Sequence, residues 1–137
     1  MNKTVVAIGL GANIGDRAGY LISTLIKLED YGVIHQQISC VYESAPWGYK
    51  KQGPFLNLVV TATTNKNPRE LLRAQQQIEI ELGRSKSRRN GPREIDLDLL
   101  FFGQHVLHTE TLTVPHPWLK EYHGMFDNQS VQPWKSQ

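Results

Sequence analysis

Apolar positions in the first half of the chain change from an unbroken run to helical spacing and then to alternation. The run at 4–10 predicts a buried strand. Leucines then recur every three or four positions between about 17 and 30, which predicts a helix with Asp16 as its N-cap. From 33 to 43 apolar and polar residues alternate, which predicts one half-buried strand with Cys40 on its buried face.

The second half of the chain begins with another alternating stretch and then returns to helical spacing. Residues 55–64 predict a strand whose even-numbered positions face the core, with Phe55 and Asn57 on the opposite face. A second helix is expected to begin after Asn67, a good N-cap residue followed by proline, and to end at Gly83.

A further strand begins with Asp96 and Asp98. Its alternate residues are expected to face the core: Leu97, Leu99 and Phe101. A short strand at 105–107 and an extended segment at 109–119 follow, since each proline disfavours helix in the residue before it. The element order predicts an α+β, ferredoxin-like β-α-β-β-α-β fold, with an antiparallel sheet and two helices on one face.

Length and composition are those of one ordinary globular domain. The chain has 137 residues, of which 39% are hydrophobic and 20% charged. We expect a single domain over 1–126 and an atypical polar tail over 127–137. Its one cysteine excludes a disulfide framework and a cysteine zinc site. The sequence has no signal peptide or membrane-length apolar run, so the cytoplasm is the expected location and no membrane partner is expected.

Positive charge is concentrated directly before the two aspartates. Of the 15 lysines and arginines, five fall within 84–93 with no acidic residue among them, while the whole chain has a net charge of only +2. Asp96 and Asp98 are two positions apart on a strand, so their carboxylates point the same way. Mg²⁺ relieves the repulsion between such carboxylates, and the basic loop suits phosphate. The arrangement indicates a site for a metal-bound polyphosphate, although an Asp-x-Asp pair alone is more often a solvated strand end.

Phe55 and Asn57 share the outer face at the start of their strand. A flat aromatic beside an amide suits a planar heterocycle, because the ring stacks and the amide supplies both a donor and an acceptor. The alternative is an exposed phenylalanine beside a strand-end asparagine, and these two residues alone favour that alternative.

Four stretches of the sequence resemble the signature of one enzyme family. They are AIGLGANIGD, YESAPWGYKKQGPFLNLVV, RRNGPREIDLDLLFFG and LTVPHPWL. In this order they resemble the 6-hydroxymethyl-7,8-dihydropterin pyrophosphokinases of folate biosynthesis, and the resemblance extends to Gly124. It implies a diphosphotransferase whose partners are ATP and 6-hydroxymethyl-7,8-dihydropterin, whose products are AMP and the pterin diphosphate, and whose cofactors are two Mg²⁺ ions.

The resemblance also implies roles for individual residues. Two cations and two acids are implied in catalysis, the acids as ligands of Mg²⁺: Arg84, Arg93, Asp96 and Asp98. Contacts with ATP are implied for Lys86, Arg89, Leu99, Thr113 and His116. Contacts with the pterin are implied for the main chain of Ser44, Ala45, Pro46 and Trp47 and for the side chains of Phe55 and Asn57.

Some positions depart from the family pattern. Asn90 stands where a tryptophan is usual, and Lys86 stands where an arginine is usual, which weakens bidentate phosphate binding. The stretch 122–126 reads YHGMF where the family has arginines and a pterin-stacking aromatic. One alternative is therefore a relative that binds ATP and the pterin with weakened catalysis.

An RNA-binding module is the other alternative, because the same strand order builds the common RNA-recognition fold. That function needs exposed aromatic residues on the central strands, and the stretch LNLVVTAT has none. Carboxylates on a strand face would also repel RNA. No nucleic-acid partner is therefore expected.

Overall fold

The computed structural model describes residues 3–44, 53–83 and 95–117. The elements are, in chain order, β1 (Thr4–Ala12), α1 (Arg17–Asp30), β2 (Ile34–Ile38), β3 (Tyr42–Ser44), β4 (Phe55–Thr64), α2 (Pro68–Glu81), β5 (Asp96–Phe102), β6 (Leu107–His108) and β7 (Thr113–Val114). The longer elements follow the predicted order β-α-β-β-α-β, to which β3, β6 and β7 are short additions.

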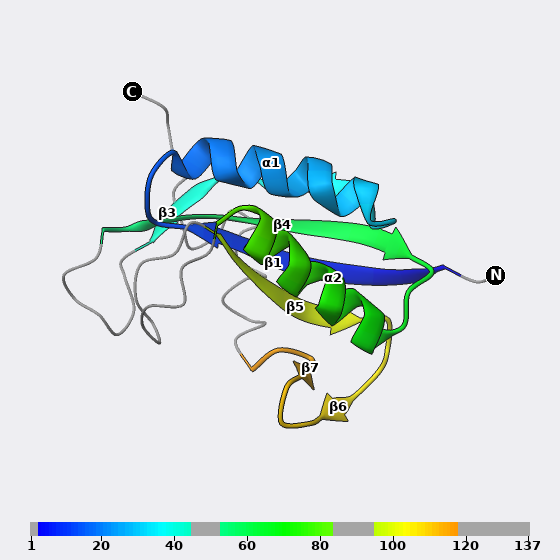
Figure 1. The fold of residues 1–137 in the computed structure, drawn as a ribbon. Coiled ribbons are helices and arrows are strands. Elements are labelled where there is room, and N and C mark those ends of the chain that lie inside the picture. Colours follow the sequence, from blue (N-terminus) through cyan, green and yellow to red (C-terminus); the bar gives the residue numbers. More distant parts are fainter. Residues whose placement is uncertain (1–2, 45–52, 84–94, 118–137) are drawn as a thin grey trace.

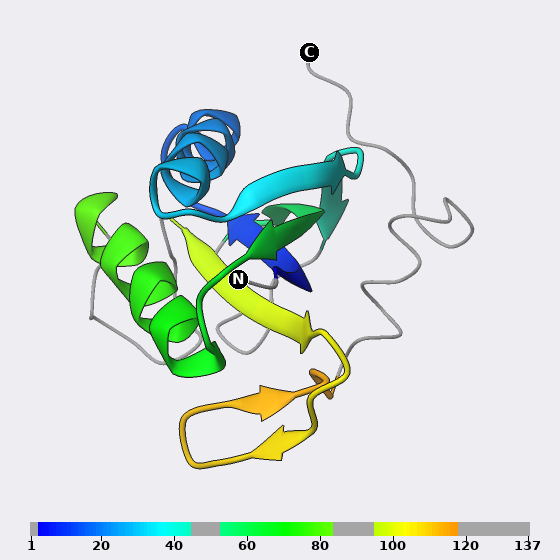
Figure 2. The ribbon, with the colours of Figure 1, turned by 90° about the vertical axis from the view of Figure 1, so that its right-hand side faces the viewer.

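The longer strands form one antiparallel sheet in the order β2-β4-β1-β5, and β3 also pairs with β4. Figures 1 and 2 show α1 and α2 together over one face of this sheet. The short strands β6 and β7 form a separate ribbon that extends from the end of β5 (Figure 2). The sheet order and the placement of the helices confirm the predicted ferredoxin-like fold.

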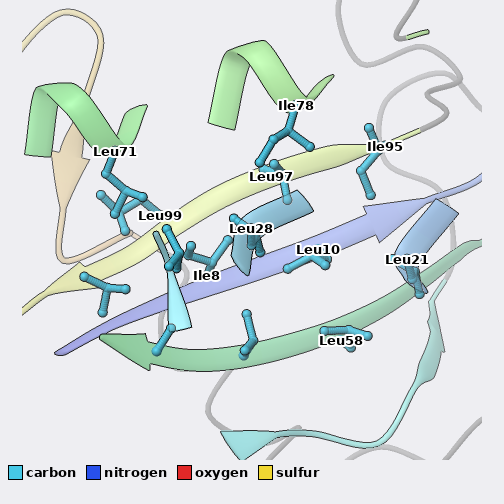
Figure 3. Packing of buried hydrophobic residues seen from close by; sticks show 14 of the residues in the cluster. Ile8, Leu10, Leu21, Leu28, Leu58, Leu71, Ile78, Ile95, Leu97 and Leu99 are labelled. Atoms are coloured by element: carbon cyan, nitrogen blue, oxygen red, sulfur yellow. The ribbon is translucent and has the colours of Figure 1, made fainter. Parts of the chain in front are cut away.

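The core lies between the helices and the sheet, and alternation along each strand decides which side chains enter it. Figure 3 shows Ile8 and Leu10 of β1 on the face where the leucines of α1 and α2 pack. The even-numbered apolar residues of β4 are buried as predicted: Leu56, Leu58, Val60 and Ala62. The residues between them, such as Gly11 and Asn57, therefore lie on the opposite face of β1 and β4.

Both helices begin at the predicted capping residues. Asp16 Oδ1 accepts a hydrogen bond from the Gly19 amide at 3.1 Å. Asn67 and Glu70 form a reciprocal capping box, with bonds of 2.8 and 2.9 Å. Gly83 follows α2 with a φ of 84°, a left-handed conformation that glycine adopts without strain. In the described part of the chain, neither helix has the length and apolarity needed to span a bilayer.

The prediction of one half-buried strand over 33–43 is wrong. Ser39 interrupts it, because its amide donates to the Val59 carbonyl and its hydroxyl accepts from the Val59 amide, both at 2.9 Å. The stretch is thereby divided into β2 and β3. Because β2 is an edge strand, its side chains are mostly exposed. Cys40, expected in the core, is exposed as well.

A β-bulge in β5 corrects a second expectation. After Leu99 the register with β1 shifts by one residue, which leaves Leu100 without a partner position on β1. Alternation resumes one position later, so Phe102 rather than Phe101 enters the core beneath the helices. Phe101 packs on the opposite face of the sheet.

The short strand expected at 105–107 begins two residues later, as β6. The His105 amide donates to the Phe102 carbonyl at 3.0 Å, and this turn occupies the positions predicted to begin the strand. β6 then pairs with β7 in antiparallel register, with Leu107 opposite Val114. The predicted extended segment thus supplies the second strand of the ribbon.

A polar network joins the C-terminal ends of the two helices on their solvent side. The Glu81 carboxylate accepts hydrogen bonds from Tyr31, the C-cap of α1, at 2.6 Å, from Lys27 of α1 at 2.9 Å and from Gln77 at 3.2 Å. These bonds, that from Tyr31 first, lower the pKa of Glu81 from 4.5 to about 2.

We expect this network to make part of the stability acid-sensitive. Because the pKa of Glu81 is lower in the folded state, its contribution is complete above pH 4.5 and is lost as the pH falls toward about 2. Glu81→Gln should therefore have a lower free energy of unfolding than the wild type at about pH 6, and the difference should shrink toward about pH 2. Urea unfolding of both proteins at several pH values measures this. A difference that stays constant with pH would contradict the assignment.

Candidate functional site

The face of the sheet opposite the helices carries the polar side chains that the sequence patterns singled out. Asp96 on β5 pairs with Gly11 on β1, and Gly11 pairs in turn with Asn57 on β4. Asp98 lies in the next row, opposite Gly9. The aspartates and the asparagine therefore lie on strands that flank the glycines of β1.

Asp96 and Asp98 share this face because Leu97, between them, points into the core. Both aspartates are half-buried. Residues two apart on a strand are separated by about 7 Å, so both carboxylates can contact one metal–phosphate group. The described residues contain no cluster of three or more His, Cys, Asp or Glu side chains able to hold a metal. Two carboxylates nevertheless fit Mg²⁺, which takes its other ligands from phosphate and water.

Gly11 leaves the central strand bare where the other side chains converge. A Cβ atom on Gly11 would lie 3.2 Å from Asn57 Oδ1 and 3.4 Å from Phe55 Cδ1. Both side chains therefore lean over Gly11 from β4, while Asp96 is its partner on β5. Since neighbouring strands are about 4.8 Å apart, Asn57 and Asp96 lie on strands about 10 Å apart. A flat ligand against Phe55 and Asn57 needs only a short substituent to reach the carboxylates.

The side-chain amide of Asn57 is oriented by its neighbours. Its Nδ2 donates to Ser44 Oγ at 2.8 Å, with longer contacts of 3.4 Å to the carbonyls of Tyr42 and Phe55. Its Oδ1 is the atom that lies over Gly11. The amide thus presents an acceptor on the face of the sheet opposite the helices, where it suits a ligand edge that carries N–H donors.

Asn13, which follows β1, and Arg17, the first residue of α1, bind residues on either side of the stretch 45–52. Arg17 Nη1 contacts Glu43 Oε2 at 2.9 Å and donates to the Pro54 carbonyl at 3.0 Å. Asn13 Nδ2 donates to the Gly53 carbonyl at 3.3 Å. Neither residue was predicted to belong to the site, because no local pattern relates it to partners 26, 37 or 40 positions away.

The chain after β7 returns to the bulge in β5. The His116 amide donates to the Leu100 carbonyl at 2.7 Å, and Thr113 is the first residue of β7. The side chain of Leu99 is in the core and 4% exposed, so a ligand can reach this residue only through its main chain. The Leu97 amide points away from β1, toward α2. Backbone N–H and C=O groups of residues two apart on a strand point the same way, so those of Leu99 also point away from β1.

The structure therefore brings Asp96, Asp98, Phe55, Asn57 and Ser44 to one face of the sheet. Leu99, Thr113 and His116 are described above, and the remaining predicted site residues lie outside the described residues: Arg84, Lys86, Arg89, Arg93, Ala45, Pro46 and Trp47. The same is true of the atypical stretch 122–126 and of the tail 127–137.

Comparison with known proteins identifies a family with this combination of fold and sequence. The family described as 7,8-dihydro-6-hydroxymethylpterin-pyrophosphokinase (HPPK) matches residues 7–127. A 2-amino-4-hydroxy-6-hydroxymethyldihydropteridine pyrophosphokinase of Aquifex aeolicus is 46% identical over 116 residues, or 85% of this chain and 72% of that protein. The protein of the same name from Bacillus subtilis is 45% identical over 120 residues, or 87% of this chain and 72% of its own. The fold also matches a crystal structure of Plasmodium falciparum HPPK-DHPS, with a TM-score of 0.61 at 14% identity, over 96% of this chain and 38% of that one.

We expect Ser44→Ala to release the side-chain amide of Asn57. The variant loses the 2.8 Å bond from Asn57 Nδ2, and a single hydrogen bond contributes about 0.5–1.5 kcal/mol to stability. The free energy of unfolding in urea should fall by about that amount. The side-chain amide signals of Asn57 in NMR spectra should move toward those of a solvent-exposed asparagine. Unchanged signals would show that Tyr42 and Phe55 suffice to orient the amide.

Proposed function

Because this chain belongs to the HPPK family, we propose that it transfers diphosphate from ATP to the hydroxymethyl group of 6-hydroxymethyl-7,8-dihydropterin, giving AMP and the pterin diphosphate. One observation carries this proposal: Phe55 and Asn57 lean over Gly11 from one side, and Asp96 pairs with Gly11 on the other. The two proposed halves of a bisubstrate site thereby lie on β4 and β5, the strands that flank β1, on one face of the sheet.

The pterin is proposed to lie against Phe55, with its edge at Asn57. A pterin is a flat heterocycle whose edge carries N–H donors, and Asn57 Oδ1 is the acceptor that lies over Gly11. The ring of Phe55 gives one stacking surface for this heterocycle. The main chain of 44–47 would complete the pocket, of which Ala45, Pro46 and Trp47 lie outside the described residues. The hydroxymethyl group would then point across β1 toward β5.

The triphosphate of ATP is proposed to lie at Asp96 and Asp98. Two Mg²⁺ ions held there would neutralise phosphate charge and help to orient the chain of phosphates. Arg84, Lys86, Arg89 and Arg93, outside the described residues, would bind the same phosphates from the loop before β5. The pterin hydroxyl oxygen then forms its bond to the β-phosphorus as the bond from that phosphorus to the AMP oxygen breaks, and the hydroxyl proton is released to water.

The base and ribose of ATP are proposed to lie along the outer edge of β5. The main chain of Leu99 faces this edge with a donor and an acceptor, the pattern that a purine edge can pair with. Thr113 and His116 follow on the segment that is bonded to the β5 bulge. This placement agrees with the contacts that the sequence resemblance implies for these residues. The cytoplasmic location expected from the sequence remains a prediction.

A coupled assay for AMP release from ATP, with and without the pterin, tests the proposed reaction. AMP should appear only when ATP, Mg²⁺ and the pterin are all present. A protein that binds both ligands without releasing AMP would instead be the weakened relative suggested by the stretch 122–126.

Asp96→Asn and Asp98→Asn should each lower kcat by about 10²–10³-fold or more, because each removes a carboxylate proposed to hold the Mg²⁺ that stabilises charge in the transition state. Both side chains are half-buried at the start of a strand, so the fold should remain. Circular dichroism and the AMP assay at saturating Mg²⁺ measure the two effects. Near-normal turnover in either variant would refute the metal assignment.

Phe55→Ala should weaken pterin binding and leave ATP binding nearly unchanged. Stacking of a base on an aromatic ring contributes roughly 1–3 kcal/mol, which corresponds to a loss of about 5- to 150-fold in affinity. Calorimetry with the pterin and a non-hydrolysable ATP analogue separates the two ligands. Equal losses for both ligands would indicate general damage to the sheet rather than a stacking role.

A further inference from the structure

Two polar side chains of α2 are buried against the strand that carries the aspartates. Gln75 is 1% exposed and Glu79 is 5% exposed. They are four residues apart and therefore lie on the same face of the helix, one turn from each other. This face also carries the apolar residues that pack in the core, such as Leu71 and Ile78.

Both side chains bind the main chain of one residue, Leu97. Glu79 Oε2 accepts a hydrogen bond from the Leu97 amide at 2.9 Å, and Gln75 Nε2 donates to the Leu97 carbonyl at 3.4 Å. Among the strands that the structure describes, β5 pairs with β1 alone, so no other described strand bonds to these outward-facing groups. The two side chains of α2 thus supply the hydrogen bonds that a further strand would make.

Leu97 is the residue between Asp96 and Asp98. The directions of the two carboxylates depend on the backbone of these three residues, because only an extended backbone places both on one face. β1 holds this backbone from one side, through the pairs of Asp96 with Gly11 and Asp98 with Gly9. α2 holds it from the other side. The regular ladder ends soon afterwards at the bulge, so the neighbouring part of β5 adds less restraint.

Burial of these groups has a cost in free energy that simple packing would avoid. A buried carboxylate loses the solvation of its charge, and Gln75 Oε1 has no hydrogen-bond partner among the described residues. Apolar side chains would extend the buried stripe of α2 without these costs. The hydrogen bonds to the Leu97 amide and carbonyl offset part of this cost, and they fix the backbone of β5 at this residue.

We propose that Glu79, assisted by Gln75, is a positioning residue for the Asp96 and Asp98 pair. It holds the peptide between them so that both carboxylates meet the same metal–phosphate group. Glu79 acts through the Leu97 amide and not by contact with substrate. The inference rests on the proposed function, since it takes the aspartates to be the ligands of Mg²⁺.

Glu79→Ala tests this role, with Glu81→Ala as a matched control. Both variants remove a carboxylate from α2, but Glu81 faces α1 and has no hydrogen bond to β5. Loss of a group that orients a metal ligand commonly costs about 10–100-fold in metal affinity or activity. The Mg²⁺ concentration for half-maximal AMP release should rise by about that factor in Glu79→Ala and stay unchanged in Glu81→Ala. Glu79→Gln, which keeps an acceptor oxygen, should recover most of the loss.

Two further readouts do not depend on turnover. Hydrogen exchange of the Leu97 amide should be faster in Glu79→Ala than in the wild type. Binding of Mn²⁺ with a non-hydrolysable ATP analogue, followed by electron paramagnetic resonance below the unfolding temperature, should be weaker. If Glu79→Ala does not fold, Gln75→Leu takes its place, and its Mg²⁺ requirement should rise, though by less.

Asp98→Asn, measured in parallel, separates failure of this inference from failure of the proposed function. If Asp98→Asn leaves Mn²⁺ binding unchanged, the metal site itself is wrong and the positioning role falls with it. If Asp98→Asn abolishes binding while Glu79→Ala binds Mn²⁺ like the wild type, only the positioning role is overturned. Equal shifts in Glu79→Ala and Glu81→Ala would also overturn it, because they would reflect the general stability of α2.

Discussion

The site depends on one constraint on the central strand β1, which must be apolar on one face and nearly bare on the other. Ile8 and Leu10 are buried against the helices, so Gly9 and Gly11 face the opposite side. A side chain at Gly11 would press on Asn57, whose carbonyl oxygen already lies over it. The glycines let groups on β4 and β5 face each other across β1. The central strand of the candidate site therefore matters for the side chains that it lacks at Gly9 and Gly11.

The two flanking strands are held in different ways. β4 lies inside the sheet between β1 and β2, so its position is set by hydrogen bonds on both edges. β5 lies at an edge, and proteins usually cover such edges because unpaired backbone groups invite further pairing. In this protein α2 covers only part of the edge. Its side chains bond to the main chain of Leu97, while the main chain of Leu99 points away from β1 and has no bond to α2 among the described residues. One edge thus combines a fixed segment with a segment proposed to bind ligand.

Features that depend on near neighbours in the chain were predictable. The limits of α2 followed from Asn67 and Gly83, whose capping and left-handed conformations are local properties. The faces of β4 followed from simple alternation. The prediction failed for Cys40, because the bonds between Ser39 and Val59 interrupt the stretch and leave Cys40 between β2 and β3. It failed for Phe101, because the bulge at Leu100 reverses the alternation of β5. The bulge arises from the pairing of β5 with β1, which the sequence of β5 alone does not reveal.

By itself, the sequence determined the order of the elements, the common face of Asp96 and Asp98, and the membership of a family. These follow from residue types and from spacings of a few positions. Only the tertiary structure decided that Gly11 separates the aspartates from Asn57 and that Glu79 is buried against Leu97. The Glu79 bond joins residues 18 positions apart, and Gly11 meets its partners through the strand order. Such contacts depend on how the sheet and helices pack as a whole, and no local pattern encodes them.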